Sequence, residues 1–452
     1  MRNRIPQTIV LSFAALILSG TLLLLLPACG ARGGLSFLQA LFTSTSAVCV
    51  TGLTVIDPGT DLTPFGQAVL ALLIQCGGLG ILTLSGFVIA TLGRRQELSD
   101  RLYVDTAHGG VRGVNPINVL RHAIVATVVV EAIGAALLFA GFGLRLGSFG
   151  LRTAWLAIFH SVSAFCNAGF SLFTTNLDDF RDDPIVSLTI VALIVVGGIG
   201  FVVISDLARV SRIDRSQRHF WKLSLHTRMV LATTAVLILG GALLTAAFEW
   251  GNALRDVPWR GRILAPLFYS VTCRTAGFDT IRTATLSSAT LALGIVLMFI
   301  GASPGGTGGG IKTTSAATIA SMIWSRARGR AVTEFRGRTI PIETVSKAIA
   351  TTAAFVMILV VANFGLAVTE VGFHPHEERA AVNLDFAFET VSAIGTVGLS
   401  TGITPKLSVG GQLILVALMF AGRTGPLVIG ASLIGRRRRE ARQLPEEDVV
   451  VG

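Results

Sequence analysis

Long apolar segments separated by short polar stretches dominate the chain. A membrane-spanning α-helix needs about 20 mostly apolar residues, and eight segments reach or approach that length. They are residues 9–26, 65–92, 124–142, 185–204, 229–248, 291–300 with its continuation, 348–368 and 413–434. The pattern predicts eight spanning helices and leaves too little chain for a separate soluble domain.

Four shorter apolar stretches lie between successive pairs of these segments. They cover residues 35–45, 151–162, 263–271 and 384–391. Because a helix of about ten residues cannot cross a bilayer, the stretches predict re-entrant pore helices that enter the membrane and turn back. The expected fold is therefore an all-α polytopic membrane protein. Its eight spans and four pore helices form four helix–pore-loop–helix repeats around a pseudo-fourfold axis.

The same pattern divides the chain into four repeats. They cover residues 1–95, 96–210, 211–330 with a glycine-rich segment, and 331–452 with a basic tail. A short motif follows each pore helix, in which a Ser or Thr precedes a glycine by five or six positions. The hydroxyl residues are Ser46, Ser163, Thr272 and Ser392, and the glycines are Gly52, Gly169, Gly277 and Gly398.

These four loops are candidates for an ion-binding site. Irregular backbone at membrane depth is tolerated only where protein buries it or where it lines water, and converging loops can offer rings of carbonyl oxygens that replace a cation's hydration shell. The loops offer no pore-facing carboxylate of the kind that calcium and magnesium prefer, so a weakly hydrated monovalent cation is favoured. The candidate residues are Val50, Thr51, Gly52, Asn167, Ala168, Gly169, Thr275, Ala276, Gly277, Thr396, Val397 and Gly398. The alternative is that each glycine only permits close helix packing, and four equivalent occurrences weigh against it.

Composition and charge agree with a membrane protein. The chain is 52% hydrophobic and 14% charged, against about 25% charged residues in a soluble domain. The net charge is +11, and most Lys and Arg lie in the N-terminal segment and alternate loops, which predicts cytoplasmic termini. The arginine run at 436–439 indicates a stop-transfer flank, compatible with contact to anionic lipid or a cytoplasmic partner, so we expect no nucleic acid as partner. The first segment resembles a lipoprotein signal ending at Cys29, but Pro27 is unfavourable there and we expect the helix to be retained.

A glycine-rich segment interrupts the sixth apolar segment. Pro304 and the glycines after it break a helix at membrane depth, where a flexible loop could obstruct an ion path. The expected gate consists of Gly305, Gly306, Thr307, Gly308, Gly309, Gly310 and Lys312. A phosphate-binding loop is not expected, because Ile311 separates the last glycine from the lysine. A plain helix kink remains the alternative.

Several polar residues occupy apolar segments. A charge such as that of Arg423 at the centre of a span costs about 2.5–3.5 kcal/mol on insertion scales, so we expect Arg423 to hydrogen-bond carbonyls of the glycine-rich break and to oppose conduction. Glu131 in the third segment receives no assignment. The five cysteines show no metal-ligand spacing and indicate small packing residues. The histidines His160, His374 and His376 are interpreted as surface or loop residues.

The four loop motifs, the glycine-rich segment and the Arg423 motif together resemble the bacterial Ktr/Trk potassium transporter superfamily, and the resemblance covers nearly the whole chain. It implies a selectivity filter that binds K⁺ through backbone carbonyls at Gly52, Gly169, Gly277 and Gly398, a gate at 305–310 and an electrostatic latch at Arg423. It also implies a homodimer in the bacterial plasma membrane, docked on a cytoplasmic ring of nucleotide-binding subunits (KtrA-like), without a covalent cofactor. Because the sequence starts directly with the first repeat, it resembles the Ktr type, KtrB-like, in which stimulation by Na⁺ is common.

Other functions fit the sequence less well. A secondary carrier should show broken helices in paired halves, whereas this pattern is fourfold. An enzyme needs a nucleophile, a metal cluster or an acid–base pair at membrane depth, and we expect none. Within the same fold, a sodium or low-selectivity cation transporter is the remaining alternative, and Gly52 argues against it, because plant relatives that favour sodium carry Ser there.

Overall fold

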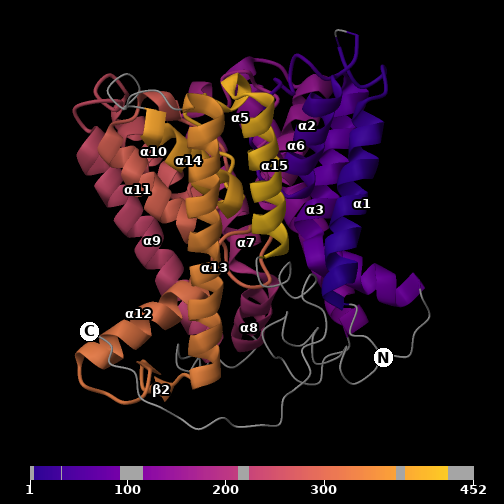
Figure 1. Ribbon diagram of the computed structural model, residues 1–452. Helices are drawn as coiled ribbons and strands as arrows, with labels where there is room; N and C mark the ends of the chain where they lie inside the picture. Colours follow the sequence, from indigo (N-terminus) through magenta and orange to yellow (C-terminus); the bar gives the residue numbers. More distant parts are fainter. Residues whose placement is uncertain (1–4, 32, 92–115, 212–222, 373–381, 426–452) are drawn as a thin grey trace.

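The computed structural model describes residues 5–31, 33–91, 116–211, 223–372 and 382–425 (Figure 1). Three helices recur four times along this part of the chain. The long first helices are α1 (Ile5–Leu24), α5 (Pro116–Leu146), α9 (Leu225–Glu249) and α13 (Ile342–Leu366). The short pore helices are α2 (Phe37–Val48), α6 (Leu151–Phe165), α10 (Trp259–Thr272) and α14 (Val382–Gly395). The second helices are α3 (Pro64–Thr91), α7 (Pro184–Ile199), α11 (Ser288–Phe299) and α15 (Val409–Thr424).

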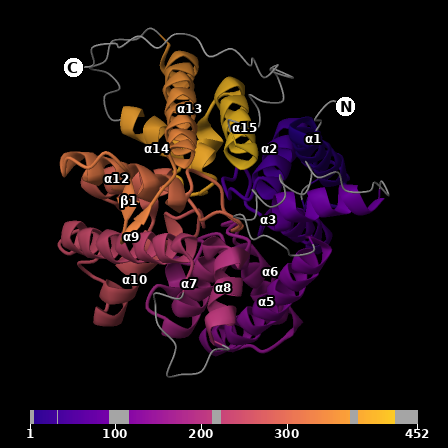
Figure 2. The ribbon, with the colours of Figure 1, turned by 90° about the horizontal axis from the view of Figure 1, so that it is seen from below.

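The four groups follow one another around a common centre, as the view from below shows (Figure 2). The predicted all-α polytopic membrane fold is therefore confirmed, while the boundaries assigned between repeats stay predictions. In the described residues the only sheet is a hairpin of β1 (Glu334–Phe335) and β2 (Arg338–Thr339). Two further helices, α8 (Phe201–Ser211) and α12 (Thr313–Ala327), continue α7 and α11 at the lower end of the molecule (Figure 1).

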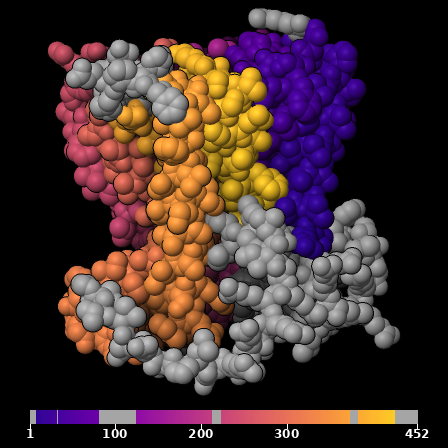
Figure 3. Space-filling model, viewed as in Figure 1, coloured from indigo at the N-terminus to yellow at the C-terminus, as the bar shows by residue number. Residues whose placement is uncertain are grey.

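The first helices span the apolar belt without interruption. Four apolar stretches within the described residues are long enough to cross a membrane as one helix, namely Gln7–Leu24, Ile124–Leu146, Leu225–Glu249 and Ile342–Val371. Their outward faces carry exposed aliphatic and aromatic side chains, such as Val361 and Phe364 on α13 (64% and 72% exposed). Helix α13 stands along one face over the whole height of the molecule (Figure 3). This surface suits contact with lipid chains.

The second helices are broken, and here one sequence prediction was wrong. Residues 185–204 were expected to form one continuous span, but α7 ends at Ile199 and α8 leaves at 96°. Gly200 joins the two with φ +90°, a conformation that costs glycine little and other residues much. Gly80 (φ +52°) forms an equivalent break inside α3, and Gly425 (φ +83°) follows the last residue of α15. Hydropathy could not locate these breaks, because the residues on both sides of each glycine are equally apolar.

Each of the first three pore helices is fastened to the first helix of its repeat by a serine. The hydroxyl groups of Ser44, Ser161 and Ser270 donate to the carbonyls of Ile17, Glu131 and Ile238 at 2.7, 2.7 and 2.8 Å. In the fourth repeat, the amide of Asn363 donates to Thr390 instead, at 2.8 Å. Small residues let the backbones of helices approach within membranes. The four pore helices are thereby held at one level inside the ring of longer helices.

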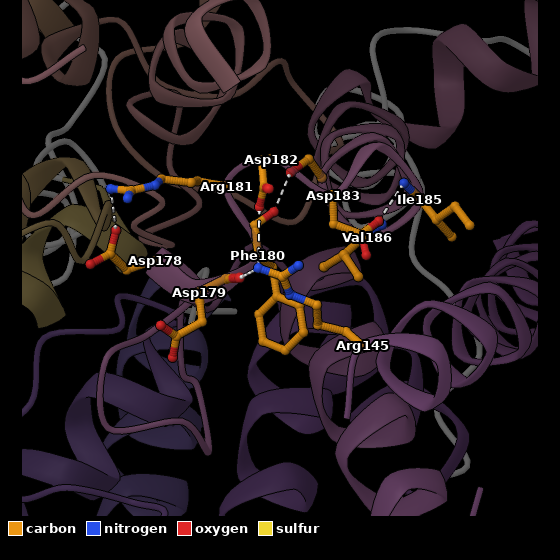
Figure 4. A network of polar contacts seen from close by, with 10 residues as sticks. Arg145, Asp178, Asp179, Phe180, Arg181, Asp182, Asp183, Ile185 and Val186 are labelled. Carbon is orange, nitrogen blue, oxygen red and sulfur yellow. Dashed lines mark hydrogen bonds and ion pairs between the residues drawn. The ribbon is translucent and has the colours of Figure 1, made fainter. Parts of the chain in front are cut away.

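A charged network lies at the end of the molecule where α5 finishes (Figure 4). Arg145 donates to the carbonyl of Asp179 at 3.2 Å and pairs with Asp182 at 3.5 Å. Asp183 caps α7, since its carboxylate accepts from the amides of Ile185 and Val186 at 2.8 and 3.2 Å. These exposed pairs contribute little stability singly, but they mark where the apolar belt ends.

Candidate functional site

The loops after the four pore helices share one strained backbone conformation. Each has a non-glycine residue with positive φ two positions before its glycine. These residues are Val50 (56°), Asn167 (59°), Thr275 (73°) and Thr396 (52°), and the glycines are Gly52 (96°), Gly169 (70°), Gly277 (78°) and Gly398 (94°). A residue held in such a region costs on the order of 1–3 kcal/mol and persists where the surroundings impose it. Four equivalent outliers, two of them at β-branched threonines, mark these loops as a functional-site candidate.

Backbone hydrogen bonds fix the direction of the loop carbonyls. The residue before each glycine donates its N–H back to the hydroxyl residue of its own pore helix. The four bonds are Thr51 to Ser46 (2.8 Å), Ala168 to Ser163 (2.7 Å), Ala276 to Thr272 (2.9 Å) and Val397 to Ser392 (2.8 Å), all to carbonyl oxygens. In a planar trans peptide the C=O points opposite to the N–H. The carbonyls of Val50, Asn167, Thr275 and Thr396 therefore point away from the pore helices.

The serine side chains extend this pattern in two of the repeats. The hydroxyl of Ser46 accepts from the N–H of Gly52, and that of Ser392 from the N–H of Gly398, both at 3.0 Å. By the same peptide geometry, the carbonyls of Thr51 and Val397 are also turned away from their helices. The other two hydroxyls differ, since Ser163 donates to the carbonyl of Phe170 at 2.8 Å and Thr272 has no partner in the part of the chain described.

The four glycines form a closed ring. A Cβ atom added to Gly169 would lie 2.6 Å from the carbonyl oxygen of Ala276, in the loop of the next repeat. The other three glycines make the same kind of contact with a backbone carbonyl oxygen of another loop. A Cβ on Gly52 would meet the oxygen of Ala168, a Cβ on Gly277 would meet that of Val397, and a Cβ on Gly398 would meet that of Thr51. Each loop thus touches the next in chain order, and the fourth returns to the first. The geometry brings all twelve predicted loop residues together around one centre.

The glycine-rich loop between α11 and α12 lies directly against this ring. Gly309 donates its N–H to the hydroxyl of Thr396 at 3.0 Å. Thr307 donates its hydroxyl to the carbonyl of Phe165 and its N–H to that of Gly197, both at 3.1 Å. A side chain on Gly308 would collide with Thr275. The loop therefore contacts the loops that follow α10 and α14, as well as the α6–α7 region of repeat 2.

The other predicted loop residues hold this segment in shape. Gly305 and Gly310 have φ of +76° and +68°, which favours glycine. A Cβ on Gly306 would lie 2.6 Å from the carbonyl oxygen of Gly198 at the end of α7. Lys312 donates from its ammonium group to the carbonyls of Gly308 and Gly309 at 2.8 and 3.5 Å. The lysine thus folds back on the loop that it follows.

Arg423 connects the loop to a third element. From α15, its guanidinium donates to the carbonyl of Thr307 in the loop and to that of Gly77 on α3. It also reaches the carbonyl of Gly78 at 3.4 Å. These α3 carbonyls lie just before the break at Gly80, where helical partners are missing. The predicted contact between Arg423 and the glycine-rich loop is present.

The remaining predictions have mixed outcomes. His160 was expected to be a surface or loop residue, and this was wrong: it is fully buried on α6, because its ring packs among those of Phe142, Phe159 and Phe173. His374 and His376 lie outside the described residues. Glu131 is buried (9% exposed) and accepts from the amide of Gln75 at 3.3 Å. Four of the five cysteines are buried and Cys76 is partly so, consistent with packing roles.

Two polar residues close to the ring received no role from the sequence. Glu389 on α14 is fully buried, and its carboxylate accepts from Ser400, Thr401 and Thr404, which follow the fourth loop. Arg274, in the third loop, donates to the carbonyl of Gly301 at 3.4 Å. The signal for Glu389 was present in the sequence, since an acidic residue within a short apolar pore helix needs a partner.

Known proteins resemble this chain over nearly its whole length. The family model described as "TrkH: Cation transport protein" matches residues 3–434. The Ktr system potassium uptake protein B of Vibrio alginolyticus is 36% identical over 99% of this chain and 95% of its own length. The protein of the same name from Bacillus subtilis is 35% identical over 99% and 96%, and the potassium/sodium uptake protein NtpJ of Enterococcus hirae is 35% identical over 99% and 97%.

A solved structure agrees with the fold. The potassium transporter TrkH from Vibrio parahaemolyticus superposes with a TM-score of 0.71 at 20% identity, covering 94% of this chain and 83% of its own. At that identity the likeness concerns the fold alone. Together with the family model and the relatives, it shows that this chain is a multi-pass membrane protein of the TrkH cation transport family.

Proposed function

We propose that this protein takes up potassium ions across the bacterial plasma membrane through the ring of four loops. The observation that carries the proposal is the closed ring of glycines with carbonyls turned away from the pore helices. Rings of neutral carbonyl oxygens suit a weakly hydrated monovalent cation. The names of the three relatives, two for potassium and one for potassium and sodium, point the same way. K⁺ is then the transported ion, with no covalent cofactor and no enzymatic activity.

The glycine-rich loop is the gate in this proposal. It lies against Thr275 and Thr396 of the ring, so an ion leaving the ring on that side meets the loop first. Arg423 holds the loop by its hydrogen bond to Thr307 and adds a positive charge beside the cation path. Opening then requires the loop to leave the ring and this bond to break.

The assembly follows from the kinship with the Ktr proteins. We propose four repeats bounded near residues 95, 210 and 330, both termini in the cytoplasm, and a homodimer docked on a KtrA-like ring of nucleotide-binding subunits. Support comes from the relatives' designation as one lettered protein of a Ktr system. The arginines of α12 and the hairpin, including the exposed Arg328 and Arg336, agree with a cytoplasmic location of that end by the positive-inside rule.

The test is ion uptake in a bacterial host that lacks its own potassium transporters. The protein is expressed with its cytoplasmic partner, and uptake of K⁺ or Rb⁺ is followed with Na⁺ present and absent. Saturable K⁺ uptake above that of host cells carrying the empty vector supports the proposal. Uptake that favours Na⁺ would replace the proposal with the sodium alternative. If the protein is inserted in the membrane but takes up no cation, the proposal is overturned.

A further inference from the structure

One position in the pore helices carries a buried polar residue in every repeat. It lies three residues before the hydroxyl residue of each loop motif. The occupants are Thr43, His160, Tyr269 and Glu389, with exposures of 1%, 0%, 3% and 0%. Burying a polar group without a partner is costly, so the partners of each occupant indicate what it does.

Glu389 forms hydrogen bonds with the segment that follows the fourth loop. Its carboxylate accepts from the hydroxyl of Ser400 at 2.5 Å, the N–H of Thr401 at 3.0 Å and the hydroxyl of Thr404 at 2.7 Å. Ser400 lies two residues after the ring glycine Gly398. Three hydrogen bonds to one buried carboxyl group therefore tie the segment just past the ring to its pore helix.

His160 makes the corresponding contact in the second repeat. Its Nδ1 lies 2.7 Å from the carbonyl of Leu156, which can only accept, so Nδ1 carries the proton. Nε2 is then an acceptor, and it receives the hydroxyl of Ser171 at 3.0 Å and the N–H of Leu172 at 3.4 Å. Ser171 lies two residues after Gly169, as Ser400 lies two after Gly398. A different side chain thus fastens the same point of the loop.

The other two repeats lack this contact among the described residues. Tyr269 donates to the carbonyl of Thr290 on α11 at 3.4 Å, and the hydroxyl of Thr43 has no partner. Because the ring runs in chain order, repeats 2 and 4 face each other across the centre. The two loops fastened just past the ring are therefore opposite, and the two loops without this contact lie between them.

We propose that His160 and Glu389 are positioning residues that set ion selectivity, by fixing two opposite loops just past the ring. The inference rests on the proposed function, since it assigns these residues a part in potassium selection. A smaller cation such as Na⁺ is held well only if the carbonyls move inward. Loops tied to their pore helices on opposite sides resist that movement, whereas loosened loops permit it. Selectivity between K⁺ and Na⁺ depends on the size and stiffness of the carbonyl cage.

The test removes the hydroxyl at each fastened point and leaves the ring residues unchanged. We expect Ser171→Ala and Ser400→Ala each to lower the ratio of apparent K⁺ to Na⁺ affinity by about tenfold. This is the size of change expected when one hydrogen bond to a buried group is lost. Glu389→Gln should lower it as well. Ser400→Thr keeps the hydroxyl and should retain the ratio of the parent. Thr43→Val is the matched control at the same position of the first repeat and should leave the ratio unchanged.

The ratio of apparent affinities does not depend on the amount of protein in the membrane. If these residues only stabilised the fold, the substitutions would lower total uptake and leave the ratio unchanged. Ratios for Ser171→Ala and Ser400→Ala equal to the parent's would overturn the inference. A fall for Thr43→Val as large as that for Ser400→Ala would overturn it too, because general packing would then explain the effect. A parent protein that takes up no K⁺ would instead reject the proposed function itself.

Discussion

The guanidinium of Arg423 donates a hydrogen bond to the carbonyl oxygen of Thr307, although 116 residues separate the two in sequence. The second arm of the same side chain donates to Gly77 on α3. One planar group thus joins the glycine-rich loop of repeat 3 to the broken helix of repeat 1, and it does so from repeat 4. Any movement of the loop away from the ring must break the contact with Thr307.

Changing Arg423 should therefore raise potassium flux in a graded way. Arg423→Ala removes both charge and hydrogen bonds and should raise uptake most. Arg423→Gln keeps some hydrogen bonding without charge and should raise it less, while Arg423→Lys keeps the charge but not the planar fork and should stay closest to the parent. Initial rates of K⁺ uptake at equal membrane abundance give the order. A large fall in uptake for both Ala and Gln in folded protein would make Arg423 a required element of conduction instead.

Deleting residues 305–310 should raise ion flux even without the cytoplasmic partner. The loop contacts the ring through Gly309 and Thr396, so shortening it would remove the obstruction that the proposed gate forms. The measurement is K⁺ uptake by the deletion and the parent, each with and without the partner. If flux stays at the parent's level while the protein reaches the membrane normally, the segment is a kinked connection and has no gating role.

Replacing a ring glycine by serine should weaken the preference for potassium over sodium. A Cβ on Gly169 would lie 2.6 Å from the carbonyl oxygen of Ala276, so the neighbouring loop must shift and carry its carbonyls with it. Backbone strain adds to this, because φ is +70° there. The same is expected for Gly52, Gly277 and Gly398, and the measured quantity is the ratio of apparent K⁺ and Na⁺ affinities.

Gly147→Ser is the matched control for the ring glycines. Gly147 follows α5, has φ of +68°, and has open space where a Cβ would lie. It shares the backbone strain without the contact across the ring. We expect its ratio to remain that of the parent, and unchanged ratios in all four ring variants would remove the filter assignment.

Stability should depend on a buried carboxylate outside the ion path. Glu249 at the end of α9 is fully buried and accepts from the N–H and hydroxyl of Ser287 at 2.9 and 2.7 Å, which caps α11. Glu249→Gln places an amide against these donors and should destabilise the protein by about 1–3 kcal/mol. The midpoint of thermal unfolding in detergent measures the effect.

Glu370 provides the comparison for Glu249. It makes the equivalent contact with Ser408 at the start of α15, but in an exposed setting. Glu370→Gln should therefore cost less, about 0.5–1 kcal/mol, as expected for an exposed helix cap. Equal shifts in the two unfolding midpoints would contradict the importance of burial at Glu249.

Much of the fold follows from hydropathy and repetition. The apolar segments define the long helices, because each must cover the thickness of a bilayer, and the short stretches define the pore helices, because they cannot. The loop residues from Val50 to Gly398 could be found from four recurrences of one motif. Arg423 could be linked to the glycine-rich loop because a charge at membrane depth needs partners, and broken helices supply carbonyls.

Other features could not be predicted from the sequence, for physical reasons. The break at Gly200 depends on one φ angle, which hydropathy does not record. The burial of His160 depends on the helices packed around α6, and its partner Ser171 comes close only when the second loop folds back on that helix. The order in which the glycines contact one another requires all four loops to be placed at once.

The broken second helices differ from one another, and this difference has a consequence for the symmetry of the molecule. In α3 the break is a single glycine, whereas after α11 it is a loop that lies against three of the four repeats. A homotetramer would carry any such insertion in every subunit, and four copies would collide on the axis. A single polypeptide that carries all four repeats is free of that restriction. One glycine-rich loop and one arginine that bonds it can then differ from the corresponding segments of the other repeats, while the ring beside them keeps its fourfold order.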